Sequence, residues 1–139
     1  MTTLKEMIQT APKQKYPNCT TVESSFDTID AFLEDEEKLF LCQQNTKLYT
    51  VFFIRNALRT YRSLLEKAEQ INQELRDFLQ KRAMFIGIQK ADNTSRLDLS
   101  DPTNIFGRYQ DAIQSCIVAR KEYNQACIRA GYLYIVFVE

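Results

Sequence analysis

The fold is decided by residues 46–86, which combine a helical repeat with the absence of proline and glycine: TKLYTVFFIRNALRTYRSLLEKAEQINQELRDFLQKRAMFI. Side chains recur here in alternating steps of three and four residues, a spacing that places them on one face of an α-helix. The members of this stripe are Val51, Ile54, Leu58, Tyr61, Leu65, Ala68, Asn72, Leu75 and Leu79. An unbroken helix of this kind would have ~40 residues and a length of ~60 Å. We expect Gly87 and the polar stretch of residues 89–95 to end it, with a loop from Gly87 to Asp101.

Asn72 is the one polar member of the stripe, and it has two interpretations. An amide inside a coiled-coil interface can select the register or the number of helices, because an unpaired amide is costly to bury. Alternatively, the stripe rotates at this point, so that Ile71 takes the core position and Asn72 faces solvent. The sequence leaves both interpretations open.

A second helix is predicted over residues 21–43, before the long one. Its apolar side chains also recur at three-to-four spacing, with Glu36 or Glu37 filling the one gap, and are Val22, Phe26, Ile29, Leu33 and Phe40. The preceding segment Thr20-Thr21-Val22-Glu23 has the form of a capping box, in which a Thr hydroxyl and a Glu carboxylate satisfy free N–H groups at a helix start. We expect the turn between the two helices at residues 43–46.

A third main helix is predicted to start at Ser100-Asp101-Pro102, with Asp101 as its cap and Pro102 in its first turn. Its inner stripe is rich in small residues and consists of Ile105, Tyr109, Ala112, Ile113, Cys116, Ala119, Tyr123, Cys127 and Ala130. Gly131 is expected to end this helix. Residues 132–138 are continuously apolar, and periodicity does not distinguish a helix from an extended segment there.

A weak apolar repeat at Leu4, Met7 and Ile8 predicts a short N-terminal helix, and two prolines mark the linker that follows. We therefore predict an all-α fold: an elongated antiparallel helical bundle of three main helices plus a short N-terminal helix, with one helix unusually long. The chain of 139 residues fits a single domain. Within it, residues 1–19 would form an arm and linker, and residues 20–138 the bundle.

The composition argues against most catalytic classes. The chain has no histidine, which removes Ser-His-Asp and Cys-His catalysis and histidine-ligated zinc. Its three glycines are too dispersed for a phosphate-binding loop. The acidic run at residues 34–37 lacks the turn glycine and the ligand spacing of a calcium loop. We therefore expect a protein that is not an enzyme and has no catalytic residue, cofactor or metal ion.

The cysteines and the apolar runs predict a cytoplasmic, reducing environment without membrane association. The four cysteines form no C-x-x-C pair. Cys116 and Cys127 lie on an apolar stripe and are predicted to be inert core thiols, which leaves Cys19 as the one candidate for a reactive thiol. We expect no secretory signal, and the apolar runs are far shorter than the ~18–20 residues that cross a bilayer.

Arg55, Arg59 and Arg62 form the first candidate site, because they share one face of the long helix. Residues 1–45 carry four basic and eight acidic residues, a net charge of −4, whereas residues 46–82 carry eight and four, a net charge of +4. This distribution favours pairing between the two helices. An exposed protein-binding face, or a face that binds nucleic-acid phosphate, is the alternative.

The expected register of this pairing follows from the turn. In an antiparallel hairpin centred near residue 45, Glu37 faces Arg55, Glu34 lies near Arg59 and Asp30 faces Arg62. Such pairs would select the register more than they stabilise the fold, because exposed ion pairs are each worth only ~0–1 kcal/mol.

The second candidate site is the C-terminal segment, with the residues Tyr132, Leu133, Tyr134, Val136 and Phe137. A soluble protein rarely leaves such an apolar run exposed. The segment must therefore pack on the bundle or be buried against another chain, most simply in a symmetric homodimer. The sequence leaves both open.

These observations favour a non-enzymatic protein–protein interaction module, such as an adaptor, an inhibitor or an assembly subunit, that acts through helical surfaces. The expected partner is a protein, with a homo-oligomer as one form of such binding. The alternative is a nucleic-acid or nucleotide-binding module that uses the Arg55, Arg59 and Arg62 face. A net formal charge of zero argues against binding polyanions with the whole surface.

Overall fold

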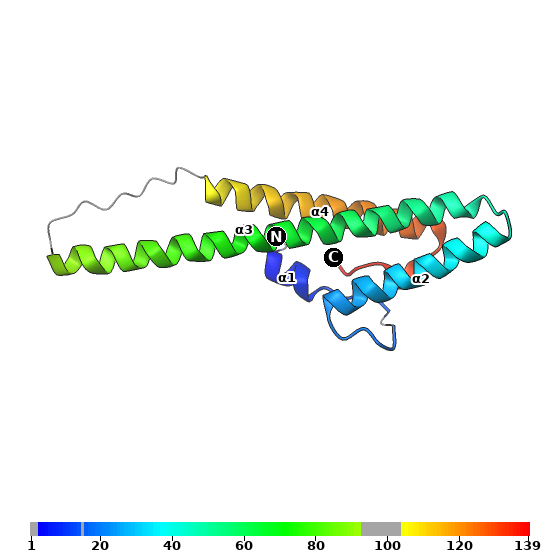
Figure 1. The fold of residues 1–139 in the computed structure, drawn as a ribbon, viewed down its shortest axis with the longest axis horizontal. Helices are drawn as coiled ribbons and strands as arrows, with labels where there is room; N and C mark the ends of the chain where they lie inside the picture. Colours follow the sequence, from blue (N-terminus) through cyan, green and yellow to red (C-terminus); the bar gives the residue numbers. More distant parts are fainter. Residues whose placement is uncertain (1–2, 15, 93–103) are drawn as a thin grey trace.

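The computed structural model describes residues 3–14, 16–92 and 104–139, and only the backbone of residues 85–92. Four α-helices follow one another in the described chain: α1 (Leu4–Gln9), α2 (Val22–Cys42), α3 (Lys47–Asp92) and α4 (Ile105–Ala130) (Figure 1). A single 3-10 turn, Leu133–Ile135, follows α4. The predicted all-α, elongated antiparallel bundle of three main helices and a short N-terminal helix is confirmed.

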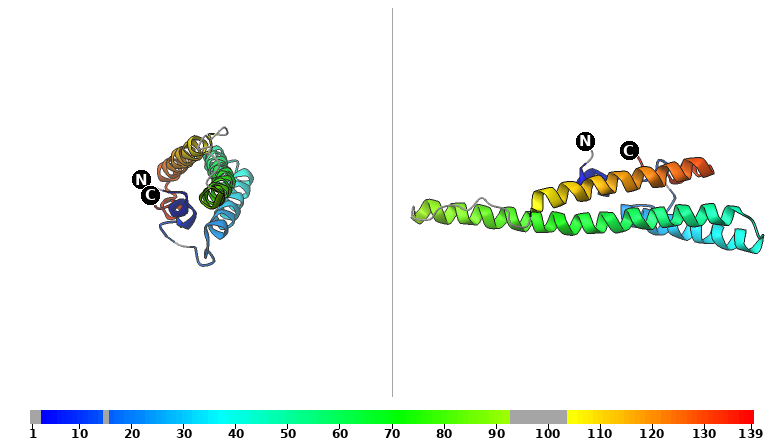
Figure 2. Two further views of the ribbon diagram at one scale, coloured as in Figure 1. Left: turned by 90° about the vertical axis from the view of Figure 1, so that its left-hand side faces the viewer. Right: turned by 90° about the horizontal axis from the view of Figure 1, so that it is seen from above.

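α3 is the axis on which the other elements pack. Both α2 and α4 lie antiparallel along it, and α1 contacts it as well (Figure 1; Figure 2). The first six members of the predicted stripe, from Val51 to Ala68, are all buried. Within the described ranges, no helix combines the length and the apolar character that crossing a membrane requires.

The structure decides between the two interpretations of Asn72. Ile71 is buried, whereas Asn72 is only half-buried. The stripe therefore rotates and Ile71 takes the core position. A straight helix has 3.6 residues per turn and drifts by ~20° in each heptad, so a strict heptad stripe turns away from the core over several turns.

The helix α3 continues through Gly87 and ends at Asp92, within the predicted polar stretch, so the predicted start of the loop at Gly87 is wrong. One glycine in a helix costs about 1 kcal/mol relative to alanine, which is too little to end a long helix. α4 begins at Ile105, so the predicted start at Pro102 is also wrong. Asp101 and Pro102 themselves lie outside the described residues.

The helix caps agree with the predictions in part. Thr21 is the N-cap of α2, and its hydroxyl accepts a hydrogen bond from the Ser24 N–H at 3.1 Å. The capping box predicted from Thr20 and Glu23 does not form, because a cap at Thr21 makes Ser24 the third helical residue. Gly131 ends α4 as predicted, with a φ of 85° that suits glycine.

The C-terminal segment folds back into the chain's own core, which decides in favour of internal packing. Ile135, Val136 and Phe137 are buried. The Phe137 ring lies at the centre of an aromatic cluster, with ring centroids 5.2 Å from Phe26 and 5.4 Å from both Tyr61 and Tyr123. The segment thereby joins α2, α3 and α4 through one side chain.

Hydrogen bonds hold the backbone of this segment from two sides. The Asn124 side chain donates to the Phe137 carbonyl at 3.0 Å and accepts from the Phe137 N–H at 2.9 Å. On the other side, Lys13 N–H donates to the Val136 carbonyl at 2.8 Å, next to a bridge between Pro12 and Phe137. The predicted linker is thus fixed at its first residues, because the extended C-terminal backbone pairs with it.

The N-terminal arm is also part of the core. Leu4 and Met7 of α1 are buried in the same cluster as the stripe of α3. Thr3 and Glu6 cap this short helix reciprocally, with the Glu6 N–H donating to the Thr3 hydroxyl at 3.3 Å and the Thr3 N–H donating to the Glu6 carboxylate at 3.2 Å. Six residues alone do not make a stable helix, so α1 depends on these caps and on its two buried side chains.

We predict that Phe137→Ala destabilises the protein by about 3–5 kcal/mol, the usual cost of removing a buried phenylalanine ring. Urea denaturation followed by circular dichroism measures this change. Leu133→Ala is the matched control in the same segment, because this side chain is 59% exposed, and its effect should stay within about 0.5 kcal/mol. Equal effects of the two substitutions would show that the segment is not packed in the core.

Candidate functional site

Arg55 lies inside the contact between α2 and α3, as the favoured interpretation predicts. Its Nη1 donates to Glu37 at 2.7 Å, which confirms the predicted pair, and its Nε and Nη2 donate to Asp30 at 2.9 and 3.1 Å. The Arg55 side chain is only 14% exposed. Its two hydrogen bonds hold the pKa of the Asp30 carboxyl below the usual value. This guanidinium is therefore neutralised within the chain.

The other two arginines are paired as well, although not with the predicted partners. Arg59 meets Asp30 at 3.4 Å, and Arg62 meets Asp27 at 2.6 Å. These partners lie three or four residues nearer the start of α2 than the predicted ones. The ion pairs Arg55–Glu34, Arg59–Asp30 and Arg62–Asp27 share one register, which is shifted by three residues from the predicted one. The internal pairing of the three arginines is thus confirmed, but the predicted register is wrong except for the pair of Arg55 with Glu37.

The residues of the second candidate site are divided between core and surface. Val136 and Phe137 are buried within the chain, whereas Leu133 is exposed. Tyr132 and Tyr134 are half-buried and pack against each other and against Phe32, with ring centroids 5.8–6.2 Å apart. Only Leu133 and the outer edges of the two tyrosines remain on the surface.

Three of the four cysteine side chains are buried, and that of Cys42 is exposed. All four cysteines are free. Burial raises the pKa of Cys116 to about 11 and that of Cys127 to about 12, which agrees with the prediction of inert core thiols. Cys19, the candidate reactive thiol, is buried. Among the described residues, no group of three or more Cys, Asp or Glu side chains is arranged to hold a metal ion.

Arg120 is a buried polar residue that the stripe of α4 did not predict. It is 2% exposed, and its Nε and Nη1 have no hydrogen-bond partner. The guanidinium lies close enough to the Tyr61 hydroxyl to oppose the rise in its pKa that burial causes, yet the two groups make no hydrogen bond of good geometry. An unpaired cation in a core is costly. Because it is enclosed, Arg120 offers no surface for a partner.

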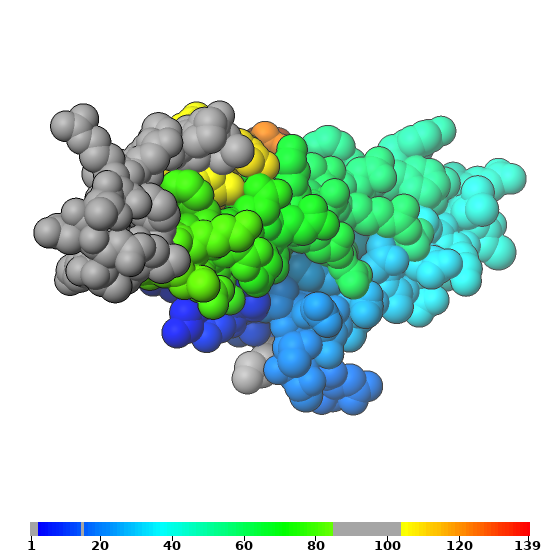
Figure 3. Space-filling view, turned by 60° about the vertical axis from the view of Figure 1, so that its left-hand side comes forward, coloured from blue at the N-terminus to red at the C-terminus, as the bar shows by residue number. Residues whose placement is uncertain are grey.

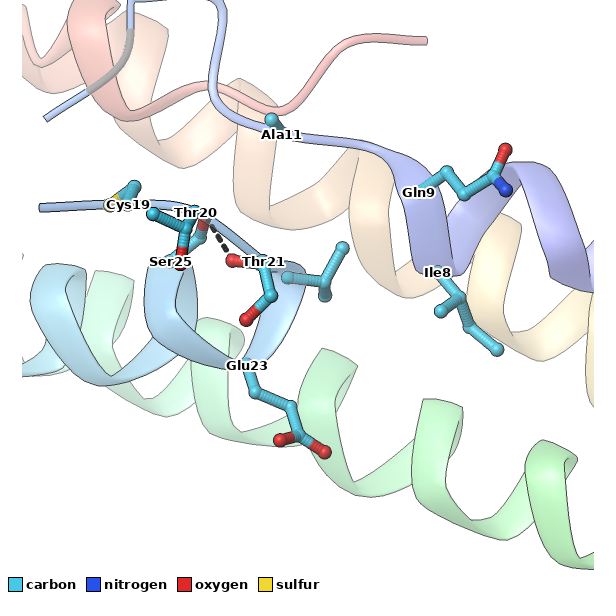
Figure 4. A pocket seen from close by; sticks show the side chains of 9 residues that line it. Ile8, Gln9, Ala11, Cys19, Thr20, Thr21, Glu23 and Ser25 are labelled. Atoms are coloured by element: carbon cyan, nitrogen blue, oxygen red, sulfur yellow. Dashed lines mark hydrogen bonds between the residues drawn. The ribbon is translucent and has the colours of Figure 1, made fainter.

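The surface feature best suited to binding is a groove between α1, α2 and α3, which we call the acidic groove. It has a volume of about 380 Å³. Its floor is apolar and its rim is charged, and the lining residues are Ile8, Val22, Glu23, Phe26, Arg62, Leu65, Glu66 and Glu69. A second hollow of about 540 Å³, on the side of the linker, shares Ile8, Val22 and Glu23 with it (Figure 4).

The groove exists because the helices around α3 are short. α2 begins at Val22, and α1 has only six residues. The apolar face of α3 near Leu65 is therefore covered by two helix ends rather than by one continuous helix. Figure 3 shows α1 in dark blue next to the lighter blue of the linker and the start of α2, both beneath the green of α3. Ile8, which forms one wall, remains 39% exposed.

The rim of the groove is predominantly negative. Glu23 on α2 and Glu66 and Glu69 on α3 face one cation, Arg62. The carboxylates of Asp27, Glu66 and Glu23 together raise the pKa of Arg62, with the hydrogen bond to Asp27 as the largest cause. Figure 4 shows Glu23 and Ile8 projecting from α2 and α1 toward the side on which α3 passes. The groove thus combines apolar contact area with excess negative charge.

Sequence reasoning did not identify this groove, because its residues come from three helices. Ile8 and Val22 belong to different elements, and the three glutamates are spread over α2 and α3. A stripe analysis assigns Val22, Phe26 and Leu65 to the core. Only the lengths of α1 and α2 reveal that part of this core remains open to solvent.

Comparison of the chain with protein-family models, with curated protein sequences and with solved structures gives no match. The interpretation of the groove therefore depends on its own geometry and charge.

We predict that Asp30→Asn destabilises the protein at neutral pH by about 1.5–3 kcal/mol, the range for hydrogen bonds to charged groups. Because folding lowers the pKa of Asp30, its contribution is complete above the unfolded pKa of ~3.9 and is lost as pH falls through the folded pKa. The stability difference between wild type and variant should therefore shrink below about pH 4. Asp35→Asn, at an exposed position of α2, should show little difference at any pH. A constant difference for Asp30→Asn would contradict the charge pairing.

We also predict that Arg120→Met stabilises the protein by about 1–4 kcal/mol, because methionine fills similar space without burying an unpaired charge. The melting temperature and the urea midpoint measure this change. Arg129→Met, at an exposed position of the same helix, controls for the loss of one positive charge. A destabilised Arg120→Met would show that the guanidinium has a favourable partner in the folded protein.

Proposed function

We propose that the chain is a non-enzymatic protein–protein interaction module, such as an adaptor, an inhibitor or an assembly subunit, that binds its partner in the acidic groove. The observation that carries this proposal is the apolar part of the groove lining, in which the side chains of Ile8 and Val22 remain accessible above the buried Phe26 and Leu65. Protein interfaces typically have such an apolar centre surrounded by a polar rim. The groove has both parts within one small surface.

Charge supports a protein partner over nucleic acid. Arg55, Arg59 and Arg62 each have a carboxylate within 4 Å, so a phosphate backbone would have to compete with existing ion pairs. The groove itself carries three glutamates and one arginine, which would repel a polyanion. No feature of the described surface favours the nucleic-acid alternative.

The experiment is a selection from a phage-displayed library of random 16-residue peptides on the immobilised protein. We expect peptides to be enriched and to bind Ile8→Ser at least about 10-fold more weakly, because this change removes one apolar wall worth more than about 1.4 kcal/mol. Ile128→Ser is the matched control, since Ile128 is 53% exposed on α4 and does not line the groove. It should leave binding unchanged.

Two results would contradict the proposal. The first is the absence of any enriched peptide, and the second is equal binding of the peptides to wild type and Ile8→Ser. Circular dichroism of both variants is the control that tests whether they remain folded. Fluorescence anisotropy with a generic RNA and a generic DNA duplex tests the alternative function, for which tight binding that weakens steeply with salt is the signature.

A further inference from the structure

We infer that the occupant of the acidic groove is a short, basic, amphipathic helix of a partner protein. This inference rests on the proposed function and adds to it the chemistry of the partner. Three properties of the groove lead to it: the unbalanced carboxylates on the rim, the helical nature of every wall, and the small apolar floor.

The carboxylates of the rim are only partly neutralised within the chain. The one cation of the lining, Arg62, donates to Asp27 at 2.6 Å and lies 3.5 Å from Glu66. Within the described part of the chain, neither Glu23 nor Glu69 has an ion-pair partner. Lys5, the basic residue of α1, does not line the groove. A partner with lysine or arginine beside its apolar side chains would supply the missing positive charge.

The N-terminus of α2 does not reverse this preference. A helix N-terminus attracts anions through its dipole and its free N–H groups. Here the Thr21 hydroxyl accepts from the Ser24 N–H, and Glu23 stands in the first turn. The positive end of the dipole is therefore already offset by a carboxylate of this chain, and an anionic partner would meet Glu23 first.

The walls of the groove determine the backbone conformation of the occupant. All three walls are α-helices, and apart from the free N–H groups at the start of α2 their backbone groups bond within their own helix. They offer no row of free N–H and C=O groups to which an extended peptide could add as a strand. An occupant that lies on the apolar floor must satisfy its own backbone groups, and an α-helix does so.

The floor determines how the helix would be anchored. Ile8 on α1 and Val22 on α2 form its sides, and Phe26 and Leu65 lie buried below them. Apolar side chains at positions i and i+3 or i+4 of a partner helix lie on one face and would fill such a floor together. Basic residues flanking that face would then reach Glu23, Glu66 and Glu69.

The test uses the peptides enriched on the wild-type protein. We expect them to carry a net positive charge and apolar residues at i and i+3 or i+4. A fluorescein-labelled member should bind the triple variant Glu23→Gln, Glu66→Gln, Glu69→Gln at least about 10-fold more weakly, the equivalent of about 1.4 kcal/mol. The control triple variant Asp35→Asn, Asp77→Asn, Glu122→Gln removes three exposed carboxylates outside the groove and should bind like wild type.

Two further measurements make the test independent of folding. The double variant Glu23→Gln, Glu69→Gln leaves both carboxylate partners of Arg62 in place and should still weaken binding. A proline in the middle of the labelled peptide should abolish binding, because it breaks a helix.

The outcomes separate this inference from the proposed function. Enriched peptides that are neutral or acidic, or that tolerate the central proline, but that lose affinity for Ile8→Ser, would overturn the basic helix and leave the groove as a protein-binding site. Equal binding of basic peptides to wild type and to the glutamine variants would overturn the role of the rim. A library without enriched peptides would overturn both proposals.

Discussion

The burial of one face of α3 is the constraint on which the rest of the structure depends. This helix has 46 residues, whereas α2 has 21 and α4 has 26, so neither neighbour covers it alone. The part of this face that α2 and α4 leave uncovered is covered by two shorter segments. Leu4 and Met7 of α1 and Phe137 of the C-terminal segment complete the same buried cluster. Segments from opposite ends of the sequence are thus held together by a single apolar surface.

The ion pairs between α2 and α3 then determine in which register α2 covers that surface. α2 presents its carboxylates to the arginines of α3, and Arg55 alone contacts Asp30, Glu34 and Glu37. The outer pairs of Arg59 and Arg62 are more exposed and add little stability. Their effect is to disfavour other registers, in which like charges would meet. The three arginines share one helix face, as in a phosphate-binding surface. In this chain they instead form ion pairs that set how α2 lies along α3.

The parts of the fold that depend on local patterns could be predicted from sequence, and those that depend on tertiary contacts could not. Periodicity located α2, α3 and α4, and Gly131 marked the end of α4. Gly87 was a poor signal for the end of a helix, because one glycine costs too little free energy to interrupt a long helix. The register of the arginine pairs depends on how α2 packs on α3, and Arg120 shows that a polar residue can occupy a core position. The candidate site could not be predicted because it also depends on tertiary contacts. No local pattern shows where the ends of α1 and α2 lie relative to α3.

The acidic groove follows from these unequal lengths, and its charge limits what can fill it. The groove lies beside α3 where the end of α1 and the start of α2 meet it. Exposed apolar side chains in a groove promote association with other apolar surfaces. The glutamates on the rim restrict that choice, because two copies that met groove to groove would bring Glu23, Glu66 and Glu69 against their equivalents. Like charges in such a contact are unfavourable. The same carboxylates that disfavour self-association through this surface therefore favour a basic partner.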